Sequence, residues 1–221
     1  MKLEDITIED SIRKACPALR LGCISCAVQV QEASEELWTY IQSVIETQLP
    51  LSAPAALGQV PTIRSTRLAY KALGKEPSRY RPSAEALRRR IAQGKGLYRI
   101  NNVVDLLNLV SVQSGFSIGG YDQDCIEGSV RLGVGRTGEP YEAIGRGPLN
   151  IEFLPVFRDD KGAFGTPTSD SVRTRVRVET QRFLMAIYSF EPGEPLEAAM
   201  EDAVQLLKRY AAATQIVQSI L

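Results

Sequence analysis

The spacing of apolar residues predicts a strand and then a helix within the first 50 residues. Between Leu19 and Gln31, apolar and polar side chains come to alternate, which is typical of a strand with one buried face. Ser34 is a suitable helix N-cap, because its hydroxyl can accept a hydrogen bond from a free amide of the first turn. Apolar residues at helical spacing then continue until Pro50 ends the pattern (Leu37, Ile41, Val44 and Ile45).

Two shorter helices are expected next. Residues 51 to 62 contain two prolines and show no periodicity, so we interpret them as a connection. The first helix is predicted from Ile63 to Leu73, with Gly74 just beyond its end. Ser83 is predicted to cap the second helix, which runs from Ala84 to about Gln93.

We interpret residues 100 to 132 as a strand, a loop and a second strand. The apolar run from Ile100 to Val112 carries polar residues at near-helical spacing (Asn102, Asp105, Asn108 and Ser111). Gly115, Gly119 and Gly120 then interrupt the run, and glycine allows the main chain to approach another group closely. The glycine segment is therefore expected to be a ligand-binding loop.

The rest of the chain predicts more strands and a final helix. A hairpin is expected between Gly128 and Gly147. The expected elements are strands at residues 129 to 134, 141 to 144, 152 to 157 and 182 to 190, and an amphipathic helix from Pro195 to Tyr210. Helices toward both ends with strands between them indicate an α+β protein, and we expect residues 1 to 221 to form a single domain.

The amino-acid composition limits only the broad class of protein. The 221 residues are 44% hydrophobic and 24% charged, as in an ordinary globular domain with one core. The first ten residues carry acids rather than a basic and apolar leader, and no run of about 18 apolar residues occurs. We therefore expect a cytoplasmic protein with no membrane partner.

The cysteines and the absence of histidine argue against metal chemistry. Cys23 and Cys26 form a lone CxxC pair, and a zinc site built on it would lack ligands because the chain has no histidine. In a strand, this spacing places the two sulfurs on opposite faces. We expect Cys23 and Cys26 to be small, buried apolar side chains, and we expect no metal site and no cofactor.

Positive charge is concentrated in one segment of a chain whose net charge is zero. Residues 64 to 99 hold eleven Lys and Arg against two Glu, a net charge of +9, whereas residues 1 to 63 carry −4 and residues 100 to 221 carry −5. Such clustering is expected of a surface that contacts phosphates, although a solvated helical face explains it equally well. The candidate phosphate contacts are Arg79, Arg81, Arg88, Arg89 and Arg90.

A second segment, residues 164 to 174, has the composition of a ligand loop. Small and hydroxylated residues surround one carboxylate and one guanidinium there (Thr166, Thr168, Ser169, Asp170, Ser171, Arg173 and Thr174). Hydroxyls and main-chain amides of this kind can hold an anion, but a capped turn before a strand would have the same composition. The polar residues around Asp105 and Asn108 leave the same choice between binding a ligand and satisfying main-chain groups.

Several enzyme classes are excluded by missing residues. Without histidine the chain has no Ser-His-Asp or Cys-His arrangement and lacks the commonest general base at neutral pH. It contains no GxxxxGK[ST] motif and no convincing GxGxxG after a strand. ATP-driven aminoacylation is therefore not supported by the sequence.

Residues 104 to 122 resemble the B3/B4 domain of the β subunit of phenylalanyl-tRNA synthetase. That family carries a VDxxNYV run and a G-Q-P-(L/M)-H-A-F-D loop, which match Val104–Val110 and the segment from Gly115 to Asp122. The resemblance covers about residues 60 to 190, and segments 80 to 83 and 168 to 174 are more similar to free-standing B3/B4 proteins. It implies a barrel-like, mostly antiparallel sheet flanked by helices. The family's histidine falls on Gly119 here.

The resemblance implies a protein that binds tRNA at its aminoacylated 3′ end and hydrolyses a mischarged ester in trans. The ligand-binding candidates are Asn108, Gly119, Gly120, Tyr121, Thr168, Ser169, Arg173 and Thr174. The family's editing-site glutamate aligns with no single residue, and Asp170 is the nearest acid and the catalytic candidate. The alternatives are a non-catalytic RNA, amino-acid or nucleotide binder, and an interaction protein that uses its C-terminal helix as a dimer face. The apolar tail at residues 211 to 221 must be buried, and burial within the monomer is favoured. Monomer and homodimer both remain open.

Overall fold

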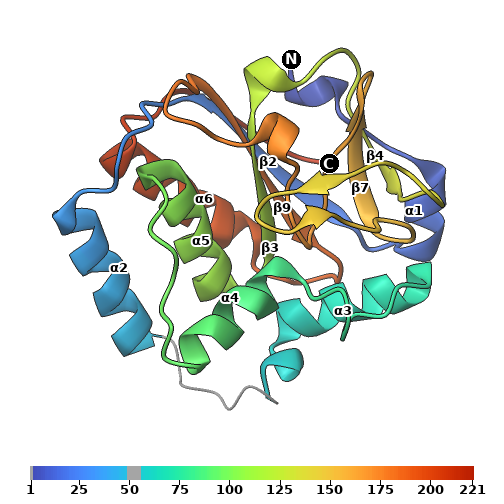
Figure 1. The fold of residues 1–221 in the computed structure, drawn as a ribbon, viewed down its shortest axis with the longest axis horizontal. Coiled ribbons are helices and arrows are strands. Elements are labelled where there is room, and N and C mark those ends of the chain that lie inside the picture. The colour runs from blue at the N-terminus through green and yellow to red at the C-terminus, as the bar shows by residue number, and fades with distance from the viewer. Residues whose placement is uncertain (1, 49–55) are drawn as a thin grey trace.

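The computed structural model describes residues 2–48 and 56–221 (Figure 1). Its helices are α1 (Asp10–Ala15), α2 (Glu35–Gln48), α3 (Pro61–Leu73), α4 (Ser83–Ala92), α5 (Asn102–Ser114) and α6 (Leu196–Tyr210), with short 3-10 turns η1 (Leu3–Asp5), η2 (Leu57–Gln59), η3 (Gln123–Cys125) and η4 (Val172–Thr174). Its strands are β1 (Thr7–Ile8), β2 (Arg20–Ala27), β3 (Ser117–Asp122), β4 (Arg131–Val134), β5 (Glu142–Ala143), β6 (Gly147–Pro148), β7 (Pro155–Asp159), β8 (Gly162–Gly165), β9 (Arg182–Ser189) and β10 (Thr214–Ile220).

The strands form two four-stranded sheets and a small two-stranded one. One large sheet has the order β10-β2-β9-β3 and is antiparallel throughout. The other has the order β1-β4-β7-β8, in which only the β1–β4 pair is parallel. The α+β class is therefore confirmed, and the sheets are mostly antiparallel. The pairings of the described strands leave both large sheets open, so the barrel-like closure is unconfirmed.

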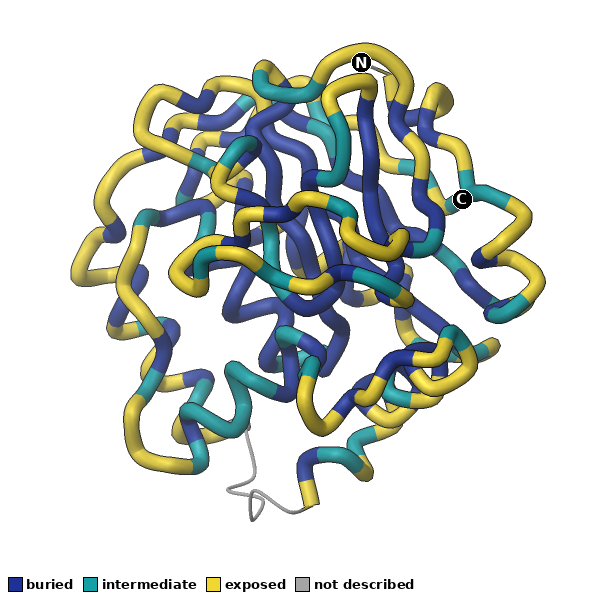
Figure 2. The backbone as a smooth tube through the Cα atoms, turned by 45° about the vertical axis from the view of Figure 1, so that its right-hand side comes forward, coloured by how far each residue is buried: buried dark blue, intermediate teal, exposed yellow. Residues whose placement is uncertain are grey.

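The β10-β2-β9-β3 sheet lies between two hydrophobic cores. Helices α2, α5 and α6 lie on one side of it, and strands β4 and β7 lie on the other (Figure 1). Strands β2, β3, β7 and β9 are mostly buried, and Figure 2 shows the buried segments gathered in the interior of the molecule. Cys26 belongs to the helix-side core and Cys23 to the core between the sheets, so the predicted placement on opposite faces is confirmed. Burial raises the pKa of Cys23 to about 12 and that of Cys26 to about 11.

The apolar run after residue 100 is a helix, so the predicted first strand of that unit is wrong. Asn101 caps α5 by accepting a hydrogen bond from the Val104 amide, at 2.9 Å. The Asn102 amide group bonds to main-chain groups of Gln29, Gln31 and Tyr210, and Asp105 accepts a hydrogen bond from the Ile100 amide. These polar side chains tie the helix to its neighbours, which is the structural role that the sequence left open.

The predicted glycine loop is also wrong, because Gly119 and Gly120 lie within strand β3. Both pair with β9, opposite Ala186 and Met185. A Cβ atom at Gly120 would lie 2.5 Å from Leu107 Cδ1, so α5 can pack against β3 only where the strand has no side chain. Gly115 has the expected role of a breaker, since it ends α5 with a φ of 75°.

Other expectations are confirmed or corrected in the same way. The predicted helices near residues 35, 63, 84 and 195 and the strand at 182 to 190 correspond to α2, α3, α4, α6 and β9. The predicted hairpin is wrong, because β4 pairs with β7 and β5 pairs with β6. Pro82, not Ser83, is the N-cap of α4, and the Ser83 hydroxyl has no hydrogen-bond partner among the described residues.

Three smaller points complete the comparison. The predicted helix end at Pro50 and most of the 51 to 62 connection lie outside the described residues. Elements η1, β1 and α1 were not expected, and the apolar tail after α6 forms β10. Within residues 2–48 and 56–221, no helix is long and apolar enough to cross a membrane.

Candidate functional site

The loop that follows β8 is held in one conformation by its own hydroxyl groups. Thr166 Oγ1 accepts hydrogen bonds from the amides of Thr168 and Ser169, both at 3.1 Å, and donates to the Ser169 carbonyl. Tyr141 donates its phenolic proton to the same carbonyl at 2.7 Å. Asp170 follows directly, and its own carbonyl accepts a hydrogen bond from the Ile144 amide at 3.0 Å. The turn therefore presents the Asp170 side chain from a fixed main chain.

The Asp170 carboxylate points into the protein, toward β3. Its Oδ2 accepts a hydrogen bond from the Gly120 amide at 3.0 Å. Its Oδ1 is buried and has no hydrogen-bond partner among the described residues. Burial raises the pKa of Asp170 to about 7, although the Gly120 amide and the neighbouring Tyr121 hydroxyl act in the opposite direction. Asp170 thus changes its charge near neutral pH, in a chain that has no histidine to do so.

Buried phenols surround this carboxylate. The Tyr121 and Tyr188 hydroxyl oxygens lie 3.4 Å apart, and burial raises the pKa of both side chains well above the ordinary value. The Tyr121 ring lies edge-on to Phe157 and Phe164, which fixes its position between the two large sheets. We call Tyr121, Tyr141, Asp170 and Tyr188 the Asp170 cluster.

The Tyr121 hydroxyl occupies the space of two missing side chains. A Cβ atom at Gly119 or at Gly165 would overlap this hydroxyl and would lie 2.6 Å from Tyr121 Cζ. A Cβ at Gly119 would also lie 3.0 Å from Asp170 Oδ1. Position 119 is where the resemblance places the family's histidine, so in this chain a phenol and a carboxyl group fill that volume.

The glycine segment of β3 and the loop that follows β8 lie side by side. Gly120 bonds to Asp170, and Tyr121 packs over Gly165. However, tightly packed side chains occupy the space between the segments. The structure therefore has no open cavity between these two segments among the described residues.

Several ligand-binding candidates are engaged in internal contacts. Thr168 Oγ1 lies 2.9 Å from the buried Tyr70 hydroxyl, and Thr174 is fully buried. The Arg173 guanidinium donates to both carboxylate oxygens of Asp159, at 2.8 and 2.9 Å, and lowers the pKa of that carboxyl group. Asn108 is buried on α5. Ser169 and Asp170 are the half-buried members of the loop.

The start of α4 adjoins the Asp170 loop. The Ser83 amide donates a hydrogen bond to the Pro167 carbonyl at 2.8 Å, which brings Arg81 near the loop. Arg81 is half-buried, and its Nε lies 3.9 Å from the buried Glu85 carboxylate, which Arg67 contacts at 2.8 Å. The basic segment at residues 64 to 99 and the hydroxyl-rich loop at residues 164 to 174 therefore meet at this point.

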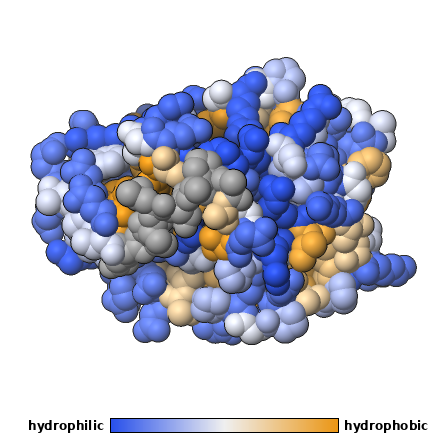
Figure 3. Space-filling model, turned by 90° about the horizontal axis from the view of Figure 1, so that it is seen from below, coloured by the Kyte–Doolittle hydropathy of each residue, from blue (hydrophilic) through white to orange (hydrophobic). Residues whose placement is uncertain are grey.

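The arginines of α4 differ in what they contact. Arg88 donates to the carbonyls of Val112 and Gln113, at 2.7 and 2.9 Å, near the C-terminal end of α5. Its guanidinium thus satisfies main-chain groups, which argues against the predicted phosphate contact. Arg90 lies 3.8 Å above the exposed Tyr98 ring, and Arg89 lies 3.6 Å from Glu85. Hydrophilic side chains cover most of the face where α3 and α4 lie (Figure 3).

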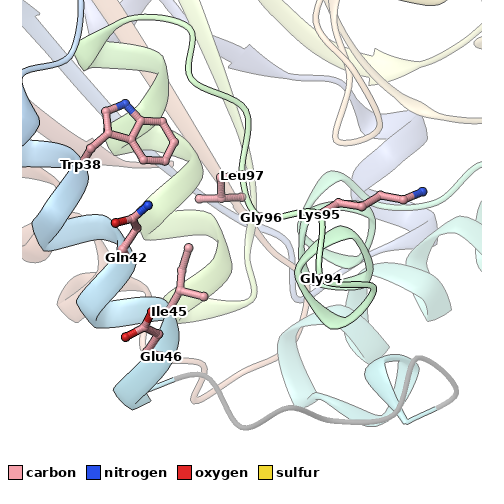
Figure 4. A pocket seen from close by; sticks show the side chains of 8 residues that line it. All are labelled: Trp38, Gln42, Ile45, Glu46, Gly94, Lys95, Gly96 and Leu97. Atoms are coloured by element: carbon pink, nitrogen blue, oxygen red, sulfur yellow. The ribbon is translucent and has the colours of Figure 1, made fainter.

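A cavity of about 470 Å³ lies elsewhere, between α2 and residues 94 to 97 (Figure 4). Trp38, Ile45 and Leu97 give it an apolar wall. The Lys95 side chain points away from this wall in Figure 4, so its charge and that of Glu46 do not converge on the cavity. We therefore do not assign the functional site to it. Among the described residues, no three or more Asp, Glu, Cys or His side chains are grouped so as to hold a metal ion.

Sequence reasoning identified Asp170 and Tyr121 but missed Tyr141 and Tyr188. Tyr188 lies on β9 and Tyr141 lies before β5, far from Asp170 in the sequence. Neither has a local motif that marks it. Their shared position follows only from strand pairing, and the sole sequence signal is that Gly119 and Gly165 leave room for a long side chain.

Comparison with known proteins supports the assignment suggested by residues 104 to 122. The family model described as B3/4 domain matches residues 65–212. The solved N-terminal fragment of the phenylalanyl-tRNA synthetase β subunit from Pyrococcus horikoshii is similar at 10% identity and a TM-score of 0.47, over 97% of this chain and 49% of that one. This chain thus spans about half the length of that fragment. No curated protein matches. Since the family model covers well over half of its length, the chain belongs to the B3/4 domain family.

Proposed function

We propose that this B3/4-domain protein binds the aminoacylated 3′ end of tRNA and hydrolyses mischarged esters in trans, with Asp170 as general base. The observation that carries the proposal is the Asp170 carboxylate, whose Oδ1 lacks a hydrogen-bond partner among the described residues and whose pKa is raised to about 7. A general base is most effective when its pKa is near the working pH. Membership in the B3/4 family directs the choice of substrate.

The chemistry requires little beyond placing one water molecule. An aminoacyl ester is already activated, so orienting water against its carbonyl carbon accounts for much of the acceleration. Asp170 Oδ1 accepts a proton as the water oxygen bonds to that carbon. The bond between the carbonyl carbon and the ribose oxygen then breaks, and the proton passes to the departing ribose oxygen. The products are the free amino acid and the tRNA hydroxyl, with Asp170 regenerated.

Substrate access makes a further demand on the loop. Asp170 Oδ1 is buried, so an ester can reach it only if the surrounding chain moves. The proposal therefore includes a shift of the turn at residues 166 to 169 when the aminoacyl group binds. Ser169, which is half-buried at the outside of the turn, would then face the ligand.

Phosphate recognition is proposed for Arg79, Arg81, Arg89 and Arg90, with Arg88 excluded because it caps α5. Arg81 is next to the Asp170 loop through the bond between Ser83 and Pro167. Arginine guanidinium groups match phosphate oxygens, and their contribution to binding weakens as salt rises. The protein could thus hold the tRNA backbone and the ester at adjacent places.

The decisive experiment measures deacylation of a panel of charged tRNAs, with Asp170→Asn as the test variant and the exposed Asp202→Asn on α6 as its matched control. We expect wild type and Asp202→Asn to release amino acid from one or a few tRNAs, at rates that rise with pH through about 7. We expect Asp170→Asn to be slower by about 100-fold, since general bases typically contribute 10²- to 10⁴-fold. Equal rates for all three proteins would remove Asp170 from the mechanism.

The second candidate is a binding module without catalysis. It is favoured by the tight packing around Asp170, because Tyr121 fills the volume that a substrate group would need. Filter binding of uncharged and charged tRNA at two salt concentrations separates the candidates. Tight, salt-sensitive binding with no release above the buffer rate would establish the binder and exclude the hydrolase.

A further inference from the structure

Strand β10 leaves one row of its main-chain groups unpaired. It is the edge of the β10-β2-β9-β3 sheet, and Leu21 and Leu221 exchange two main-chain hydrogen bonds at 2.9 and 3.0 Å. In an antiparallel pair, such reciprocal bonding alternates along the strand. Ser219 and Val217 therefore bond inward to β2, in register with Cys23 and Ser25.

The residues that alternate with Val217, Ser219 and Leu221 point their main-chain amides and carbonyls away from β2. These are Gln218 and Ile220, preceded by Ile216 where a bulge ends. The η1 turn packs against β10 and β2, but among the described residues no main-chain hydrogen bond joins it to Gln218 or Ile220. Within residues 2–48 and 56–221, this outward row therefore has no main-chain partner.

This edge carries none of the side chains that usually protect edge strands. Natural edges are commonly shielded by Lys, by Pro or by a covering element. Residues 211 to 221 contain no charged residue and no proline. Val217 is 55% exposed and Ile220 is 39% exposed. The opposite edge of the same sheet, β3, is by contrast buried at every residue.

The sequence of this edge is nearly symmetric about its centre. Residues 216 to 220 are Ile-Val-Gln-Ser-Ile, so Gln218 is flanked by an apolar β-branched residue two positions away on either side. Two copies paired antiparallel about Gln218 would place Ile216 of one opposite Ile220 of the other. Cross-strand pairs of this type are favourable, and no like charges meet.

We propose that β10 pairs antiparallel with β10 of a second copy of this chain, about a twofold axis through Gln218. The contact joins the two four-stranded sheets into one continuous sheet and forms about six main-chain hydrogen bonds. Because an interface made by one strand is small, the dimer is weak and dissociates on dilution. It does not involve the Asp170 cluster and is independent of the proposed hydrolysis.

Sedimentation of the full chain at concentrations up to about 500 μM tests the proposal, since small interfaces bind weakly. Gln218→Lys places two like charges opposite each other at the axis, whereas Gln205→Lys adds the same charge on the exposed face of α6. We expect wild type and Gln205→Lys to form dimers and Gln218→Lys to remain monomeric with an unchanged circular dichroism spectrum. A monomeric wild type, or a dimer that survives Gln218→Lys, would overturn the proposal.

A cross-linking experiment tests the register separately. Directly opposed residues of a hydrogen-bonded antiparallel pair have Cα atoms about 5.5 Å apart, which suits a disulfide. Gln218→Cys should therefore give a disulfide-linked dimer on mild oxidation, and Gln205→Cys should not. Equal cross-linking of both variants, or of neither, would contradict an axis at Gln218.

Discussion

Replacing Asp170 by asparagine should change how the stability of the protein depends on pH. Burial raises the pKa of this carboxyl group from its ordinary value of 3.8 to about 7 in the folded chain. The folded state therefore keeps a proton that the unfolded chain releases at lower pH. The stabilising effect of this proton is fully present below about pH 4 and is lost as the pH rises through about 7.

The size of the effect follows from the shift itself. A change of about three pKa units corresponds to about 4 kcal/mol, at 1.36 kcal/mol per unit. The asparagine side chain is neutral at every pH, and its carbonyl oxygen can still accept a hydrogen bond from the Gly120 amide. The free energy of unfolding of Asp170→Asn should therefore gain about 4 kcal/mol relative to wild type between about pH 4 and about pH 8.

Urea unfolding of both proteins at several pH values measures this difference. The other carboxyl groups are common to both proteins, so their titration largely cancels in the comparison. Asp202→Asn, which changes an exposed residue on α6, should show no such trend. If the difference between wild type and Asp170→Asn stayed constant from about pH 4 to about pH 8, the raised pKa of Asp170 would be refuted.

Two further predictions concern packing and charge. Gly119→Ala should lower the free energy of unfolding by about 2 kcal/mol or more, because its Cβ meets the buried Tyr121 ring. Gly58→Ala should have little effect. Thermal melts in which both variants shifted equally would contradict this prediction. Arg88→Ala should lower the stability of the fold but leave the salt dependence of tRNA binding unchanged, whereas Arg81→Ala should reduce that salt dependence. Thermal melts and filter binding of both variants measure these effects. A weaker salt dependence for Arg88→Ala and an unchanged one for Arg81→Ala would contradict the prediction.

The parts of the fold that the sequence predicted are those with a strong local signal. Helices α2, α3 and α6 have clear periodicity with a cap or a breaker at one end, and β9 contains a short apolar run at residues 183 to 187. By contrast, α5 is buried on nearly every side, and such a run is apolar in a helix and in a buried strand alike. Its length, which favours a helix, was the better guide.

In the candidate site, too, the residues with a local sequence signal were predicted and the others were not. Asp170 was identified from the composition of its own loop, which the hydroxyl of Thr166 does organise as a turn. The phenols around it come from separate elements, and only the pairing of β3 with β9 brings Tyr121 and Tyr188 together. Helical spacing predicts the direction in which Arg88 points, but it does not show whether carbonyl groups of a neighbouring helix lie within reach. The contact of Arg88 with the Val112 carbonyl of α5 was therefore not expected from the sequence.

The glycines at 119 and 165 connect the missing histidine with the chemistry of the site. Both positions face the Tyr121 hydroxyl, and neither can carry a side chain while that hydroxyl is there. An imidazole at position 119 would also press on Asp170 Oδ1. In a chain that has no histidine, the buried Asp170, with its pKa raised to about 7, thus supplies a group that titrates near neutral pH, next to the volume that Gly119 leaves to Tyr121.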